Sequence, residues 1–224
     1  MTGHALHLRQ RSAYLLAVGV AVACAACLHV FGRGDSLPVI GALPLLPVAA
    51  AAGVAGFVLC RLLEWCGLGP TSPLRVTPAG VAGILLLGGL LALPPIAIDI
   101  AFGFPKELNL PLPGAVFFYP SIALVAEVAF HLGPLALLGL PFGRGRAPGW
   151  LIWPVVLVEP LFQLSFLSGP FLMALLVFGN VSLISAAQLW LYRRHGFLAM
   201  IGLRWAFYLF WHIAWGQARL DLLF

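Results

Sequence analysis

The chain has 224 residues, of which 62% are hydrophobic and only 8% are charged. A soluble domain of this length cannot bury so much apolar surface, so the composition excludes that class and predicts an all-α polytopic membrane protein. The formal net charge of +5 comes from arginines that stand singly or in pairs at the ends of apolar segments. Such arginines are typical of orientation signals, and we expect no nucleic-acid partner.

Seven apolar segments follow one another, each close to the roughly 20 residues that a helix needs to cross a bilayer. They cover residues 13–31, 39–60, 79–98, 113–140, 150–168, 170–192 and 197–217. The first segment follows basic residues as a signal peptide does, but it is longer than the usual apolar region and further segments follow it. We therefore expect a single transmembrane domain over residues 1–224, a bundle of about seven helices in the lipid bilayer.

The basic residues predict an orientation with the N-terminus in the cytoplasm, because positive charge concentrates on the inner side of membrane proteins. In this orientation the inner side receives Arg9, Arg11, Arg61, Arg75, Arg144, Arg146, Arg193 and Arg194, and the outer side receives Arg33, Lys106 and Arg219. The abundance of Ala, Gly, Leu and Arg beside a single lysine suggests a bacterial source. We expect a protein of a prokaryotic inner membrane.

Three charged residues, Glu127, Glu159 and Arg204, stand near the middle of apolar segments. A charged side chain at the centre of a membrane helix costs roughly 2.5–3.5 kcal/mol on insertion scales. Such residues therefore face the protein interior, pair with one another, or carry out chemistry. This polar set is the main indication of function.

Glu127 and His131 are four residues apart and so share one face of a helix. A buried carboxyl can transfer protons, and a neighbouring histidine can orient a water molecule. The alternative is a Glu–His hydrogen bond that only joins helices. Intramembrane ionisable groups are functional more often than not, which favours the chemical interpretation.

In the fifth segment Glu159 precedes Pro160 and shares a face with Gln163. Proline has no N–H, so the carbonyl of Val156 loses its helical partner and the helix is disturbed there. A kinked helix beside a buried glutamate is suited to the lining of a cavity. The alternative is a packing kink with a protonated Glu159.

In the seventh segment Arg204, Tyr208 and His212 form a stripe at i, i+4 and i+8. Arg204 lies too deep to reach the membrane surface, so we expect it to pair with Glu127 or Glu159. The alternative is a bridge that only packs helices, with His212 in the outer aromatic belt.

Together these residues predict a site in the core of the bundle, where two carboxyls, two histidines and an arginine activate a water and stabilise an oxyanion. The candidate catalytic residues are Glu127, His131, Glu159, Arg204 and His212. No cofactor is required by the sequence. A divalent metal such as Zn²⁺ is possible on Glu127, His131 and His212, although their spacing is not diagnostic.

Residues 113–217 resemble the CPBP intramembrane proteases, also called CAAX-protease-like or Abi proteins. That family carries the motifs Glu-Glu-x-x-x-Arg, Phe-x-x-x-His and His-x-x-x-Asn/Asp on separate helices. Here Ala126 and Glu127 stand at the first pair, and His131 replaces the arginine. Phe166 stands at the second-motif histidine, four residues after Phe162, and His212 opens a third motif that ends in Gly216. An alternative alignment places the first motif at Glu159–Gln163.

The resemblance implies that Glu127 and His212 help to activate the attacking water, with a membrane-associated protein or peptide as the substrate. His131 or Glu159 would then replace the missing histidine. Two other functions stay open: a catalytically inactive scaffold of the same fold, or a small proton-coupled transporter that uses both glutamates. A hydrated cavity around the polar residues would favour chemistry or transport, and tight dry pairs would favour a scaffold.

Overall fold

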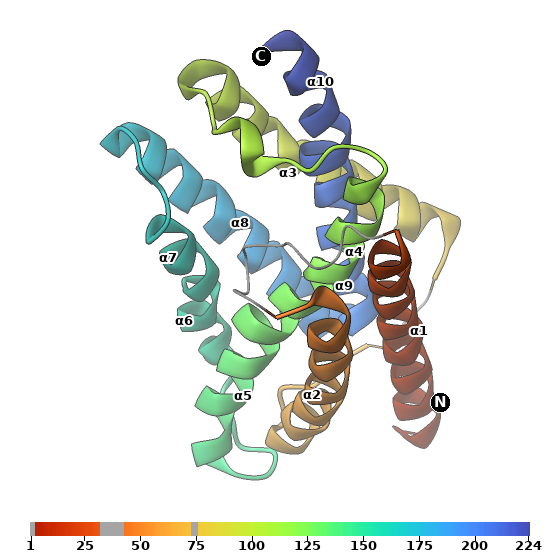
Figure 1. The fold of residues 1–224 in the computed structure, drawn as a ribbon. Coiled ribbons are helices and arrows are strands. Elements are labelled where there is room, and N and C mark those ends of the chain that lie inside the picture. The colour runs from red at the N-terminus through yellow and green to blue at the C-terminus, as the bar shows by residue number, and fades with distance from the viewer. Residues whose placement is uncertain (1–2, 32–42, 73–75) are drawn as a thin grey trace.

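The computed structural model describes residues 3–31, 43–72 and 76–224, with side chains from Gln10 onward. The predicted start of the second helix at residue 39, together with the side chains of Arg9, Arg33 and Arg75, lies outside this description. The described residues form helices joined by turns and loops, without strands, as Figure 1 shows. Its α-helices are α1 (Gly3–Val30), α2 (Leu45–Cys66), α3 (Pro78–Phe102), α4 (Gly114–Glu127), α5 (Gly133–Gly139), α6 (Ile152–Val156), α7 (Val158–Leu164), α8 (Phe171–His195), α9 (Phe197–Tyr208) and α10 (Gly216–Leu222).

Two π-helices join these elements without a break in the path of the chain. Val128–Leu132 connects α4 to α5, and Leu209–Trp215 connects α9 to α10. Each junction therefore gives one long helix with a wide turn inside it, Gly114–Phe142 and Phe197–Leu222.

Six helices of the described chain are long and apolar enough to cross a membrane. This confirms the predicted all-α polytopic bundle. The fifth predicted segment, 150–168, is the exception, because its helical part is the shorter stretch Gly149–Leu164. The break between α6 and α7 falls at Leu157, whose N–H donates to the carbonyl oxygen of Pro154 at 3.3 Å. Pro160, which has no N–H, follows one turn later.

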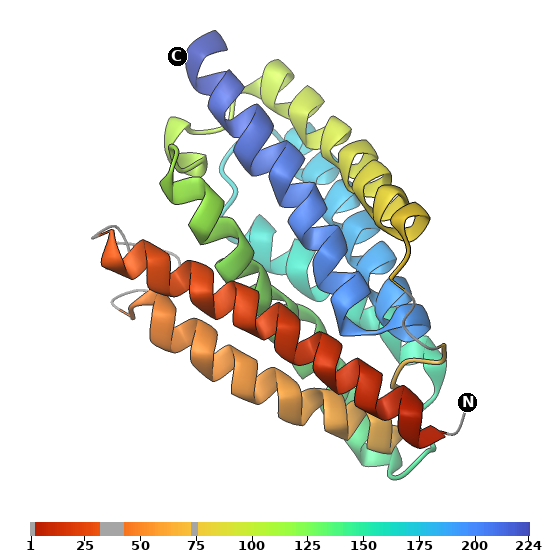
Figure 2. The same cartoon turned by 90° about the vertical axis from the view of Figure 1, so that its right-hand side faces the viewer.

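The short α6–α7 pair nevertheless takes the chain from one end of the bundle towards the other. Figures 1 and 2 place the start of α1 and the end of α10 at opposite ends of the molecule. Six long helices alone would return the chain to the side where it began, so the α6–α7 pair serves as a further pass between α5 and α8.

Helix α9 lies at the centre of the bundle, where it packs against α1, α3, α4 and α8. Its contact with α3 is close because Gly88 faces it. A Cβ added at Gly88 would lie 2.5 Å from Cβ of Ala206 and 2.9 Å from the backbone nitrogen of Phe207. Small residues allow membrane helices to approach in this way.

We predict that Gly88→Ala destabilises the bundle, because the added methyl group has to push α3 away from the backbone of α9. Overpacking of this kind typically costs about 1–3 kcal/mol. Gly83→Ala is the matched control on the same helix, since a Cβ there meets no atom within 4 Å. Unfolding of the detergent-solubilised protein, titrated with sodium dodecyl sulfate, measures both. Equal stability of the two variants would contradict the close contact.

Candidate functional site

The three charged residues singled out in the sequence form one buried cluster in the middle of the bundle. Arg204 on α9 is only 2% exposed. Its Nε donates to Oε1 of Glu127 at 2.6 Å, and its Nη1 and Nη2 donate to Oε1 and Oε2 of Glu159 at 2.8 and 2.6 Å. The expected pairing is present, and it involves both glutamates. The two parallel bonds to Glu159 give the planar, directional contact that arginine forms with carboxylates.

Three further side chains, His131, Gln188 and Tyr208, join Glu127, Glu159 and Arg204 in this cluster, which we call the central network. Gln188 on α8 donates to Oε1 of Glu127 through a short hydrogen bond and accepts from Nη2 of Arg204 at 3.2 Å. The hydroxyl of Tyr208 accepts from Nη1 of Arg204 at 3.1 Å. The network therefore joins α4, α7, α8 and α9.

Every N–H of the Arg204 guanidinium is used. Arginine carries five such donors. One goes to Glu127, two go to Glu159, and the others go to Tyr208 and Gln188. No donor is left for an oxyanion, so in this arrangement Arg204 positions both carboxylates and offsets one of their two negative charges.

His131 occupies the first π-helix and is fully buried. Its Nδ1 lies 2.8 Å from Oε2 of Glu127, the carboxylate oxygen that Arg204 and Gln188 do not use. Its Nε2 has no hydrogen-bond partner and lies 3.9 Å from Oε2 of Glu159. The ring is thus held by Glu127 on one side and has an unpaired nitrogen on the other.

Glu159 lies in the first turn of α7, directly after the break at Leu157. Besides its bonds to Arg204, its Oε1 accepts from Nε2 of Gln163 at 3.4 Å, the i+4 partner expected from the sequence. The break thus allows a short helix to present Glu159 to the centre of the bundle.

His212 is the candidate that the structure does not bring into the network. It lies on the second π-helix, where its ring stacks on Tyr119 with centroids 4.3 Å apart. Its Nδ1 is 3.2 Å from Nδ2 of Asn109. The link between His212 and the network is Tyr208, whose ring meets His212 edge-on at 4.9 Å. Glu127 and His212 therefore have separate surroundings.

Asn109 also explains the glycine at position 216. A Cβ on Gly216 would lie 2.6 Å from Nδ2 of Asn109. The amide of Asn109 fills that space and contacts His212. Phe166 is 75% exposed and lies outside the network.

A second buried ion pair was missed by sequence reasoning. Asp99 at the end of α3 accepts from Nε and Nη2 of Arg219 at 2.6 and 2.9 Å, and both residues are buried. Nη1 of Arg219 also donates to Oδ1 of Asn109 at 3.3 Å. The predicted third segment ended at residue 98, whereas α3 continues to Phe102 and so includes Asp99. Arg219, counted among the outer charges, is buried and pairs with Asp99.

The structure does not assemble the metal site considered in the sequence. His212 lies apart from Glu127 and His131. Within the residues that the structure describes, no group of three or more His, Cys, Asp or Glu side chains is placed to hold an ion.

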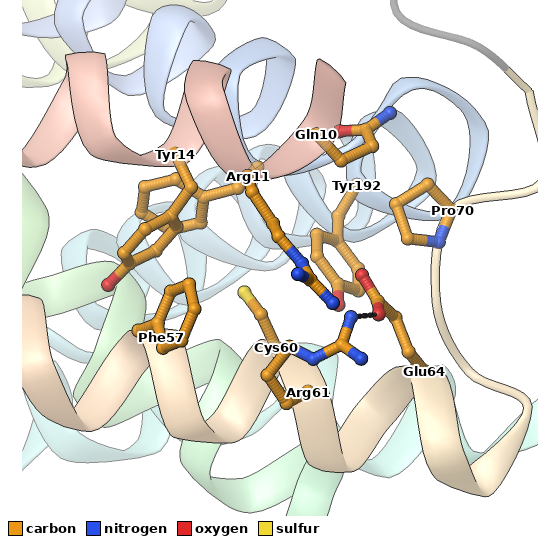
Figure 3. Close-up of a pocket in the computed structure, with 10 residues that line it drawn as sticks. Gln10, Arg11, Tyr14, Phe57, Cys60, Arg61, Glu64, Pro70 and Tyr192 are labelled. Carbon is orange, nitrogen blue, oxygen red and sulfur yellow. Dashed lines mark hydrogen bonds and ion pairs between the residues drawn. The ribbon is translucent and has the colours of Figure 1, made fainter. Parts of the chain in front are cut away.

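The network is closed by direct contacts rather than by a visible cavity. An apolar groove of about 730 Å³ runs between α3, α8 and α9, and a small cavity of about 20 Å³ lies where α1, α2 and α8 meet (Figure 3). A third hollow lies beside Val58 and Trp65 of α2. None of the three is lined by Glu127, His131, Glu159 or Arg204.

Comparison of the chain with protein-family models finds no matching family, and no curated protein and no solved structure matches it either. The site is therefore interpreted from its own geometry.

We predict that Arg204→Met lowers the free energy of unfolding by about 3–5 kcal/mol, because it leaves two carboxylates buried without their partner. The triple variant Glu127→Gln, Glu159→Gln, Arg204→Met removes all the charge and should recover most of this loss. The same sodium dodecyl sulfate titration compares them. If the triple variant is as unstable as the single one, packing rather than charge holds the network together.

Proposed function

We propose that this chain is an intramembrane hydrolase of the CPBP type, located in a prokaryotic inner membrane, with a membrane-associated protein or peptide as its substrate. The observation that carries the proposal concerns the two ring nitrogens of buried His131. Nδ1 is hydrogen-bonded to Glu127, and Nε2 has no hydrogen-bond partner. Buried polar atoms without a partner are rare and often mark sites of chemistry.

The pair of Glu127 and His131 has the arrangement of a carboxylate that orients a general base. A carboxylate that accepts from Nδ1–H fixes the ring in one tautomer and leaves the lone pair on Nε2. In the proposed step this lone pair takes a proton from a water molecule as the water attacks a peptide carbonyl. Glu127 stabilises the imidazolium that forms, and the imidazolium then gives the proton to the leaving amine as the C–N bond breaks.

The remaining members of the network support this pair. Arg204 bonds to both Glu127 and Glu159 and offsets one of their two negative charges, which lowers the cost of keeping carboxylates ionised in an apolar surrounding. Glu159 lies 3.9 Å from Nε2 of His131, close to the place where the proton would arrive. In the family the second motif supplies a histidine, and in this chain His131 takes that part.

The resemblance to the family gains support from Asn109. The third motif ends in Gly216 instead of Asn or Asp, yet the amide of Asn109 contacts His212 at that place. His131 and His212 both lie on π-helices, which also favours a functional origin, because π-bulges occur frequently at functional sites.

A catalytically inactive scaffold of the same fold is the second candidate, and a specific observation favours it. All five N–H donors of Arg204 and both carboxylates are saturated by protein groups, as expected of a structural network. A small proton-coupled transporter would share the two glutamates, but no feature of the geometry favours it over the scaffold.

We predict that His131→Gln abolishes hydrolysis while the fold persists. The glutamine amide can still donate to Glu127 from the same helix face, but it cannot accept a proton. Loss of a general base lowers the rate by about 10²- to 10⁴-fold. The assay incubates the purified protein with isolated membranes in ¹⁸O-labelled water, and mass spectrometry then detects new carboxyl termini that carry the label.

His195→Gln is the matched control, because His195 lies at the end of α8 and outside the network. It should keep the wild-type yield of labelled termini. If the wild-type protein produces none, or if His131→Gln produces as many as the wild type, the hydrolase proposal fails and the scaffold takes its place.

A further inference from the structure

The small cavity in Figure 3 lies at the end of the bundle where α1 begins, α2 and α8 end, and α9 begins. Most of the arginines lie at this end, which is the cytoplasmic side by the positive-inside rule. The cavity shares no residue with the central network. Its lining is Gln10, Arg11, Tyr14, Phe57, Cys60, Arg61, Glu64, Pro70, Tyr192 and Phe197.

One polar group in this lining has no hydrogen-bond partner. Tyr192 is only 1% exposed, and its hydroxyl, which lies beside the Cys60 thiol, has no nitrogen or oxygen partner. Figure 3 shows this hydroxyl pointing towards the space that the guanidinium groups of Arg11 and Arg61 also face. A buried hydroxyl without a partner is disfavoured, so a ligand or water that accepts its hydrogen bond would stabilise the site.

The charge of the lining selects the kind of ligand. Two guanidinium groups face a single carboxylate, Glu64, which is paired with Arg61. The excess of positive charge disfavours a cation and favours an anion that accepts hydrogen bonds from several sides. Guanidinium groups recognise phosphate in particular, through paired N–H donors.

The size of the cavity agrees with a phosphate bound at its mouth. A volume of about 20 Å³ holds a single water-sized group. One phosphate oxygen fits this volume and would accept from Tyr192 once the covered hydroxyl turns towards it, while the others stay outside within reach of exposed Arg11. Anionic phospholipids are concentrated in the cytoplasmic leaflet and present phosphate groups at this depth.

We propose that this cavity binds the phosphate group of an anionic phospholipid, with the Tyr192 hydroxyl and the guanidinium groups of Arg11 and Arg61 as the donors. The bound lipid joins the first helix to the ends of α2 and α8. This site is independent of the proposed hydrolase chemistry.

The test uses Tyr192→Phe, which removes the unpaired hydroxyl and leaves the charge and the packing of the ring unchanged. The detergent-solubilised protein is titrated with phosphatidylglycerol, with phosphatidylcholine or with inorganic phosphate, and the thermal unfolding temperature is followed. Phosphatidylglycerol should raise this temperature in the wild type and phosphatidylcholine should not. In Tyr192→Phe the apparent affinity for phosphatidylglycerol should fall about tenfold, as for the loss of a hydrogen bond to a charged group.

Arg144→Gln is the matched control for surface charge, because Arg144 lies at the same end of the bundle but outside the cavity. It should weaken binding less than Arg11→Gln does. A rise with inorganic phosphate as well would identify the phosphate group alone as sufficient, and a rise with phosphatidylglycerol alone would identify the lipid as the source.

The proposal is overturned if phosphatidylglycerol gives no rise in the wild type, or if Tyr192→Phe binds it as tightly as the wild type does. It is also overturned if Arg144→Gln and Arg11→Gln weaken binding equally. The cavity would then hold only a structural water molecule.

Discussion

The pairing of Arg204 with two glutamates is the interaction on which the rest of the structure depends. Three unpaired charges at this depth would cost on the order of 7–10 kcal/mol, more than many small proteins have in total stability. The chain offsets this cost by bringing Glu127, Glu159 and Arg204 from three helices to one point, with Gln188 from a fourth. Because the five guanidinium donors have fixed directions, the relative rotation of these helices is fixed as well. The position of His131 follows from this, since Glu127 is already held by Arg204.

Departures from regular helix geometry place the polar residues that the network needs. The break before α7 turns Glu159 inward, and the first π-helix carries His131 beside Glu127. The second π-helix carries His212, which lies two turns beyond Arg204 and contacts Asn109. Tyr208 contacts Arg204 of the network and also His212. His212 contacts Asn109, which accepts a hydrogen bond from Arg219. The central network and the pair of Asp99 and Arg219 are therefore linked by contacts along the last long helix. A hydrolase and a scaffold would both use this frame, and they differ in the role of one nitrogen atom.

The sequence predicted those features that depend on composition and on the free-energy cost of burying a charged side chain. The long apolar helices and the pairing of Arg204 follow from these two facts alone. The stripe of Arg204, Tyr208 and His212 keeps its consecutive contacts, and His212 lies outside the network because two helical turns separate it from Arg204. The pair of Asp99 and Arg219 was out of reach because its members are far apart in the chain and each stands near a helix end. Gln188 was visible as a polar residue in an apolar helix, but only the packing of α8 shows that it faces Glu127.

The state of the His131 ring is the measurement that tests the account most directly. Nitrogen-15 solid-state NMR of the histidine-labelled protein in lipid bilayers distinguishes a protonated ring nitrogen from one that carries a lone pair, and a His131→Gln sample assigns the signal. The account predicts a neutral ring with hydrogen on Nδ1 and a lone pair on Nε2, ready to accept a proton from water. A doubly protonated ring shared between Glu127 and Glu159 would contradict it, because His131 would then be a structural ion-pair partner and not a base.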